Sequence, residues 1–217
     1  ILSGLVGSEM CIRDSDKYVC PHVINYAMQM KPFRKQREKV IPYASGRVLE
    51  IGIGSGLNFN YYNKPNISEV FAVEPDSVLL KKAKKNAEFN DIKLNIYQIK
   101  AEELPFDDRS FDTVISTYTM CSIPGLGKAM SEINRVMKPD AKFLFSEHGK
   151  SPDAGIVRWQ KRLNAVQKRI AGGCHLDVDI PNEIINADFK LDQIKSMYVP
   201  GPKFLSFHYW GSASPLK

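Results

Sequence analysis

The stretch Glu50-Ile51-Gly52-Ile53-Gly54-Ser55-Gly56 decides the fold of this chain, because three alternating glycines directly follow an apolar run. The run from Arg47 to Ile51 has the length and composition of a buried strand. Glycine adopts backbone turns that other residues avoid, and it lets a ligand approach bare backbone. We therefore predict a strand, a tight turn and a helix, with a cofactor bound against the turn.

The spacing of the glycines and two acidic residues indicate the kind of cofactor. A dinucleotide site requires G-x-G-x-x-G, and this chain has Leu57 where the last glycine would lie. Glu50 would repel a pyrophosphate, but it suits the cationic sulfonium and amino end of S-adenosylmethionine. Glu74, at the end of the next predicted strand, is placed to accept hydrogen bonds from ribose hydroxyls, a role that also fits a nicotinamide enzyme. The glycine spacing therefore favours S-adenosylmethionine, and Glu74 is compatible with both cofactors.

Strands and helices are predicted to alternate through the middle of the chain. This alternation is typical of a Rossmann-like, doubly wound α/β fold with a mostly parallel sheet and helices on both faces. The predicted strands are 70–74, 94–99, 111–117 and 142–146, and the predicted helices are 78–90, 128–137 and 155–170.

The two ends of the chain carry further elements. Apolar residues recur at helical spacing between Tyr18 and Ile41, which predicts two short helices and an N-terminal helical cap over residues 16–45. Residues 191–198 and 204–209 are predicted to form a hairpin through Pro200-Gly201-Pro202 that closes the sheet. Residues 46–217 would then form the catalytic domain.

Composition limits the class of protein. The length of 217 residues fits one globular domain, and the net charge of +6 leaves peripheral contact with an anionic membrane surface open. The four cysteines lie far apart without a CxxC pair, so we expect reduced thiols, no metal site and a cytoplasmic protein. Residues 1–15 are expected to be a cloning artefact, because Met10-Cys11-Ile12-Arg13-Asp14-Ser15 resembles a translated sequencing adapter.

Five segments in order resemble the motifs of class I methyltransferases of the type 11 group, over residues 46–147. The resemblance implies a seven-stranded sheet with its last strand antiparallel and S-adenosyl-L-methionine as the cofactor. It places Gly52, Gly54 and Gly56 along the methionine end, Glu74 at the ribose, and Ala101 with Glu102 at the adenine, with Asn58, Pro75 and Thr117 as further cofactor contacts. Lys100 and Asp140-Ala141 depart from the pattern. The segments are Val48 to Asn58, Glu74, Ala101 to Phe106, Ser110 to Val114, and Arg135 to Pro139.

A narrower resemblance concerns the methyl acceptor. Residues 51–58, Cys121-Ser122-Ile123, Glu147-His148 and Gly173-Cys174 resemble the animal methyltransferase-like proteins that methylate alkyl thiols, with weaker matches at Pro21-His22 and Arg37-Glu38. Methyl transfer to a thiol is one activity that this resemblance implies. A thiol needs little activation, since its ordinary pKa of about 8.5 leaves some thiolate at neutral pH.

Other acceptors would require a base, and three residues are candidates for the catalytic machinery. His148 follows the fifth predicted strand, at the sheet edge where open α/β sheets bind ligands. His175 is the second candidate base, and Tyr118 at the same edge could orient the acceptor. Cys121 is expected to be a packed cysteine rather than a nucleophile.

The partner is expected to be a small molecule. Methyltransferases of nucleobase amines carry an Asn/Asp-Pro-Pro-Tyr string where this chain has Ser116-Thr117-Tyr118-Thr119, and the lysines of residues 81–85 have no interleaved aromatic residues. Both features argue against nucleic acid. A nicotinamide-dependent oxidoreductase and a noncatalytic nucleotide-binding module remain as alternatives, and the sequence predicts no oligomeric state.

Overall fold

A computed structural model describes residues 20–216 of the protein. The expected artefact at residues 1–15 lies outside the described residues. Among residues 20–216, no helix is both long and apolar enough to cross a lipid bilayer.

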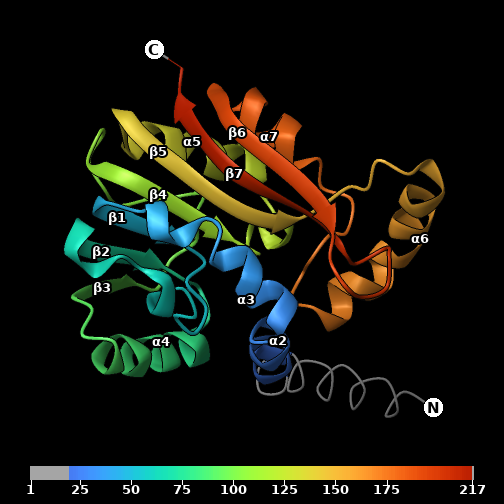
Figure 1. The fold of residues 1–217 in the computed structure, drawn as a ribbon, viewed down its shortest axis with the longest axis horizontal. Coiled ribbons are helices and arrows are strands. Elements are labelled where there is room, and N and C mark those ends of the chain that lie inside the picture. Colours follow the sequence, from blue (N-terminus) through green and yellow to red (C-terminus); the bar gives the residue numbers. More distant parts are fainter. Residues whose placement is uncertain (1–19, 217) are drawn as a thin grey trace, which may run out of the picture.

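One sheet of seven strands forms the centre of the fold, in the order β3-β2-β1-β4-β5-β7-β6 (Figure 1). Strands β1 to β5 pair with their neighbours in parallel, and β7 runs antiparallel to both β5 and β6. The predicted doubly wound fold, with an antiparallel last strand, is confirmed. The strands are β1 (Gly46–Ile51), β2 (Ile67–Val73), β3 (Leu94–Tyr97), β4 (Phe111–Thr117), β5 (Met137–His148), β6 (Phe189–Tyr198) and β7 (Phe207–Pro215).

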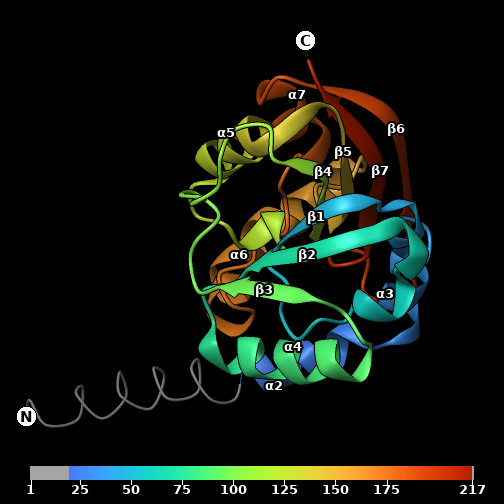
Figure 2. The ribbon, with the colours of Figure 1, turned by 90° about the vertical axis from the view of Figure 1, so that its left-hand side faces the viewer.

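Helices cover both faces of the sheet, and each face has its own apolar core (Figure 2). Successive side chains of a strand point to opposite faces of the sheet and so belong to different cores. Leu49 and Phe143 belong to the first core, and Val48 and Leu144 belong to the second. The first core contains side chains of α5 and α7, and the second contains those of α4. The helices are α2 (Cys20–Met28), α3 (Lys31–Arg37), α4 (Ser77–Phe89), α5 (Leu126–Val136), α6 (Ala154–Ile170) and α7 (Ile180–Asn186).

The helix predicted directly after the glycines is wrong. Only the single 3₁₀ turns η2 (Phe59–Tyr61) and η3 (Lys64–Asn66) lie between β1 and β2. Asn58 precedes η2, but its side chain turns inward to the buried Glu50 instead of capping a helix. Pro65 has no backbone N–H, so a helix that begins at η2 cannot continue through it. The connection therefore stays a compact loop against the sheet edge.

Two strand predictions were too short or displaced. β5 extends from Met137 to His148, so the Glu147-His148 pair belongs to the strand rather than following it. β7 covers Phe207–Pro215 instead of residues 204–209, and it lies between β5 and β6. Gly211 allows this insertion, because a Cβ atom there would collide with the carbonyl oxygen of Gln193 on β6.

Candidate active site

The three glycines after β1 adopt left-handed backbone conformations, with φ of +63° at Gly52, +56° at Gly54 and +79° at Gly56. They differ in their surroundings. A Cβ atom at Gly52 would collide with the Thr119 side chain, and one at Gly56 with the ring of Phe59. At Gly54 no atom lies within 4 Å of the Cβ position. Gly54 is therefore the position where the loop leaves open space for a ligand, while the other two permit close packing.

Glu74 ties this glycine loop to the end of β2. Its Oε2 accepts a hydrogen bond from the backbone N–H of Gly54 at 3.0 Å, and its Oε1 accepts one from the N–H of Asp76 at 3.0 Å. The side chain is buried, and this burial raises the pKa of Glu74, while the two backbone hydrogen bonds lower it. Each carboxylate oxygen keeps a lone pair, so Glu74 can still accept hydrogen bonds from a ribose.

Glu50 lies beneath the loop and is 1% exposed. Asn58 donates a hydrogen bond from Nδ2 to Oε1 at 2.7 Å, and the Tyr62 hydroxyl donates one to Oε2 at 2.7 Å. Burial raises the pKa of Glu50 to about 7, against these hydrogen bonds and the charge of Arg37. Glu50 would thus act on a bound cation through its charge rather than through direct contact. Asn58 also donates to Thr117 Oγ1 at 3.1 Å.

Glu147 is a second buried carboxylate, at the end of β5, that sequence reasoning missed as a site residue. It accepts hydrogen bonds from the Thr119 N–H at 2.9 and 3.1 Å and from the Ser116 hydroxyl at 2.8 Å. Burial raises the pKa of Glu147 to about 7. Thr119 in turn donates from Oγ1 to the carbonyl of Gly52 at 3.3 Å. Glu147 therefore fixes the turn after β4 against the glycine loop.

Tyr118 lies at the predicted edge, in a left-handed conformation with φ of +57°. Its hydroxyl lies 3.1 Å from Nδ1 of His208, the edge of the Phe33 ring contacts it at 5.1 Å between centroids, and the Arg37 guanidinium lies 5.3 Å from its ring centre. Burial raises the pKa of Tyr118. Burial, followed by the charges of His148 and Lys39, lowers the pKa of His208 to about 3. Tyr118 is therefore neutral at physiological pH and suited to orienting a ligand.

His148 is partly buried and contacts a cysteine. Its Nε2 lies 3.0 Å from Sγ of Cys174, and Cys121 Sγ belongs to the same cluster. Burial lowers the pKa of His148, but the hydrogen bond and charge of Cys174 and the charge of Glu147 outweigh it and raise the pKa above its ordinary value. His175 is outside this cluster. Its backbone N–H donates to the Cys121 carbonyl at 2.8 Å, and burial with the charge of Lys168 lowers the pKa of its ring.

The residues expected at the adenine are more dispersed. Ala101 is buried, and Glu102 accepts a hydrogen bond through Oε1 from the N–H of Gly125 at 3.2 Å, at the start of α5. Pro75 is exposed, and its carbonyl accepts from Gln98 Nε2 at 3.3 Å. The structure joins Glu74 directly to Gly54, whereas Ala101 and Glu102 border the loop after β3.

The helices α2 and α3 form where the sequence predicts an N-terminal helical cap, and α2 contacts the glycine loop. The Ser55 hydroxyl is hydrogen-bonded to Asn25 Oδ1 on α2, and Asn86 on α4 donates to the Ser55 carbonyl at 2.7 Å. Arg37 is 4% exposed and donates from its guanidinium to the Met28 carbonyl at 2.8 Å. The sequence pointed to Arg37 only through the weak resemblance of Arg37-Glu38 to the methyltransferase-like proteins that methylate alkyl thiols.

A separate hollow of about 470 Å³ opens at the connection between β5 and α6. It contains none of the expected site residues, so it is a different feature from the glycine loop. Its lining consists of Lys150, Ser151, Pro152, Ala154, Val157, Asp179 and Tyr209.

Similarity to known proteins identifies the family. Residues 49–145, which carry the glycine loop and Glu74, match the methyltransferase domain family. The chain is 30% identical over 195 residues to thiol S-methyltransferase TMT1B of Mus musculus, covering 82% of this chain and 79% of that protein. The chain is a class I S-adenosylmethionine-dependent methyltransferase. Membership of this family removes the nicotinamide oxidoreductase and the noncatalytic module as alternatives.

Other relatives of this methyltransferase differ in their acceptors. It is 31% identical over 152 residues to thiol S-methyltransferase TMT1B of Rattus norvegicus, covering 68% of this chain and 62% of that protein. It is 30% identical over 161 residues to the ubiquinone/menaquinone biosynthesis C-methyltransferase UbiE of Rickettsia massiliae, again covering 68% and 62%. The chain thus spans less than two thirds of each of these two relatives.

Solved methyltransferase structures share the fold. A putative methyltransferase of Bacillus halodurans superimposes with a TM-score of 0.69 at 16% identity, covering 84% of this chain and 98% of the other. The geranyl diphosphate C-methyltransferase of Streptomyces coelicolor, solved with S-adenosyl-L-homocysteine, gives a TM-score of 0.67 at 14% identity, covering 84% and 79%.

The loop of this methyltransferase fits its cofactor. Gly54 leaves space for a ligand, Glu74 has free acceptor positions beside it, and Glu50 supplies negative charge below. In their ionised forms the two buried carboxylates near the loop, Glu50 and Glu147, would repel the pyrophosphate of a dinucleotide.

Proposed function

We propose that this methyltransferase transfers the methyl group to the thiol of a small molecule. The observation that carries the proposal is the similarity to thiol S-methyltransferase TMT1B, which at its widest extends over 82% of the chain and thus beyond the shared cofactor domain. A stretch of that length must include the His148 cluster, which lies at the carboxyl edge of the sheet and outside residues 49–145 for two of its three members.

The described site suits an acceptor that is easily activated. S-adenosylmethionine, when bound, supplies a sulfonium methyl group for in-line displacement. The protein must then hold the acceptor in line and allow its proton to leave. Glu50 and Glu74 would hold the cofactor, and Tyr118 would orient the acceptor. Tyr118 is neutral at physiological pH and cannot serve as a base there, so His148 and its cysteine partners are the groups available for activation.

One screen tests the proposal. Purified protein is incubated with S-adenosylmethionine and a matched set of acceptors: an alkyl thiol, an aryl thiol, the corresponding phenol and a hydroquinone. We expect S-adenosylhomocysteine and a methyl thioether with the thiols, identified by mass. Turnover with the phenol or hydroquinone alone would overturn the proposal.

Methylation of a quinol carbon is the second candidate, because the chain is also 30% identical to UbiE of Rickettsia massiliae. Such a reaction requires loss of a proton from a ring hydroxyl, whose ordinary pKa is about 10. The hydroquinone in the same screen distinguishes the two, since a C-methylated product keeps both hydroxyl groups and an S-methylated product has no free thiol.

A further inference from the structure

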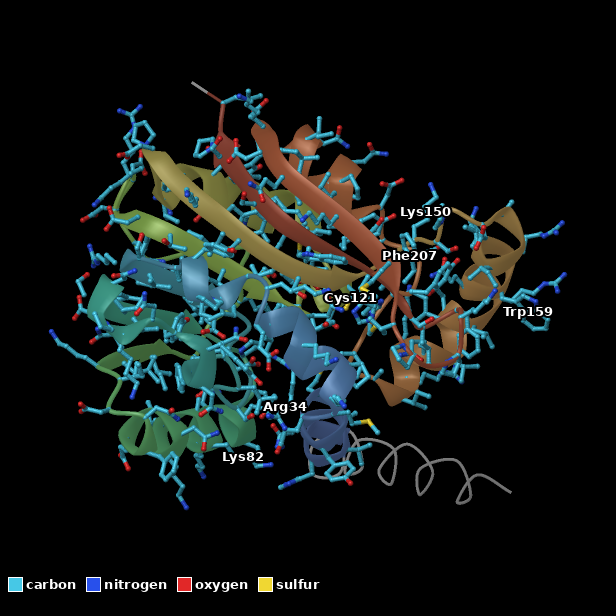
Figure 3. The ribbon with its side chains drawn as sticks, viewed as in Figure 1. Arg34, Lys82, Cys121, Lys150, Trp159 and Phe207 are labelled. Carbon is cyan, nitrogen blue, oxygen red and sulfur yellow. The ribbon has the colours of Figure 1, made fainter. Side chains whose placement is uncertain are left out.

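Two cysteines and a histidine that are far apart in the sequence meet at the carboxyl edge of the sheet. Cys121 lies on the 3₁₀ turn η4 (Met120–Ser122) after β4, His148 ends β5, and Cys174 follows α6. Their ligand atoms, two Sγ and one imidazole nitrogen, all lie within 4.8 Å of one another. Figure 3 shows Cys121 in the middle of the molecule, between α3 and α6. The expectation of no metal site rested on sequence separation, which the fold removes for these two cysteines.

We infer that Cys121, His148 and Cys174 bind a zinc ion, whose open fourth position takes the thiol of the methyl acceptor. Zinc binds thiolate sulfur at about 2.3 Å and imidazole nitrogen at about 2.0 Å, so tetrahedral ligand atoms lie about 3.5–3.8 Å apart. The separations of 3.0 Å between His148 Nε2 and Cys174 Sγ, and of at most 4.8 Å among all three atoms, require only small movements to reach this geometry. This inference rests on the proposed thiol acceptor.

The cluster is held in place by the backbone. The N–H of His175 donates to the Cys121 carbonyl at 2.8 Å, which joins the loop after α6 to η4. The N–H of Cys174 donates to the Ala171 carbonyl at 3.1 Å. Cys121 and Cys174 are 3% and 7% exposed. Such fixed, buried soft ligands favour zinc over the hard cations, which prefer oxygen.

The number of ligands points to a catalytic rather than a structural site. Structural zinc sites have four protein ligands, whereas catalytic sites have three and leave a position for substrate. Among the described residues, the cluster offers three. Two thiolates and a neutral imidazole balance the charge of the zinc ion. The ion and its three protein ligands together would therefore be neutral.

The position of the cluster connects it to the cofactor loop. Thr119, two residues before Cys121, is hydrogen-bonded through Oγ1 to the Gly52 carbonyl at 3.3 Å. A thiol on the zinc ion would lose its proton to solvent. The thiolate sulfur would then form a bond to the methyl carbon while the bond from that carbon to the sulfonium breaks, and the electron pair leaves on S-adenosylhomocysteine. His148 is then a metal ligand, and the thiol needs no separate base.

Metal content tests the site directly. Protein purified under reducing conditions is saturated with Zn²⁺, freed of excess metal and analysed by elemental and native mass spectrometry. We expect one zinc ion per chain. Cys121→Ser, Cys174→Ser and His148→Ala should each reduce zinc retention at least tenfold, with circular dichroism confirming the fold, while the matched control His22→Ala on exposed α2 retains it. Wild-type protein without zinc, or with a Cys121–Cys174 disulfide that persists after reduction, overturns the inference.

Cobalt replacement tests the open position without relying on turnover. Co²⁺-loaded protein should show thiolate charge-transfer absorption, and 2-mercaptoethanol should increase it, whereas its S-methyl ether should not. Unchanged spectra overturn the assignment of the fourth position. Failure of the proposed function would be distinct, because the cobalt protein would then ligate the thiol while no methyl thioether forms in any metal state. Thiol methylation that persists in metal-free protein would overturn the metal inference alone.

Discussion

The side chain of Glu74 accepts a hydrogen bond from the backbone of Gly54 at 3.0 Å, which fixes the one glycine of the loop that faces open space. A side chain at Gly54 would enter that space, and a β-branched residue at φ of +56° would cost about 1–2 kcal/mol of stability. We expect Gly54→Val to fold and to lose binding of S-adenosylhomocysteine in calorimetry. Gly127→Ala, at an exposed position of α5 with ordinary backbone angles and equal space, is the control and should bind normally. Normal binding by Gly54→Val would show that the cofactor lies elsewhere.

A side chain at Gly52 should reduce the stability of the fold, whereas one at Gly54 should block cofactor binding. Its Cβ would collide with Thr119, so Gly52→Ala should lower the free energy of unfolding by about 1–3 kcal/mol, measured by urea denaturation. The double variant Gly52→Ala with Thr119→Ala should recover part of this loss. An equal loss in the double variant would mean that backbone strain at φ of +63° dominates, rather than the collision.

Glu50 makes stability and cofactor affinity depend on pH in opposite directions. Because burial raises its pKa from 4.5 to about 7, the neutral form stabilises the fold, and this contribution is lost as the pH rises through about 7. A sulfonium cation favours the ionised form. We expect S-adenosylmethionine to bind several-fold more tightly at about pH 8 than at about pH 6, with proton release detected by calorimetry in buffers of different ionisation enthalpy.

The matched variant for this effect is Glu50→Gln, which keeps the size of the side chain. It should flatten the pH dependence of stability and reduce proton release, with Glu147, whose pKa is also about 7, accounting for the remainder. S-adenosylhomocysteine lacks the sulfonium charge and should show the smaller pH effect. Proton release that is identical in wild type and Glu50→Gln would assign the effect to another group.

His148→Ala should lower turnover with a thiol acceptor by about 10²-fold near neutral pH, because both a base and a metal ligand assist thiolate formation. The loss should shrink above the thiol pKa of about 8.5, where the thiolate forms unaided. The measurement is a pH profile of kcat/KM, with cofactor affinity and melting temperature as controls and His22→Ala for comparison. A loss that is equal at every pH would return His148 to a packing role.

The strand and helix pattern was largely predictable, because burial imposes clear periodicities. β4 matches its predicted range of residues 111–117, α4 is displaced by one residue at both ends, and α6 begins one residue earlier than predicted. β7 was misplaced because its second half, Gly211 to Ser214, has little intrinsic preference for strands. Pairing with β5 and β6 supplies the stability that the residues themselves lack.

The sequence indicated which candidate residues would lie together where those residues are consecutive or end adjacent strands. The glycines, Glu50 and Glu74 obey this rule. Arg37 and His208 do not, since they come from α3 and β7 and reach Tyr118 only through tertiary packing. The sequence analysis expected no metal site because the cysteines are far apart in the chain, with a separation of fifty-three positions between Cys121 and Cys174. The fold nevertheless brings their sulfur atoms within 4.8 Å, since closing a long loop costs little more entropy than closing a short one.

The placement of β7 between β5 and β6 has a consequence for synthesis on the ribosome. β6 emerges first but has no partner until residues 207–215 are made, so the growing chain exposes the open edge of β5 and an unpaired β6 together. At about 5–20 residues per second this interval is short, yet both edges are templates for pairing with other nascent chains. The sheet is therefore completed in one step that adds two strands at once, and until that step the outer edge of β5 stays open to pairing with another chain.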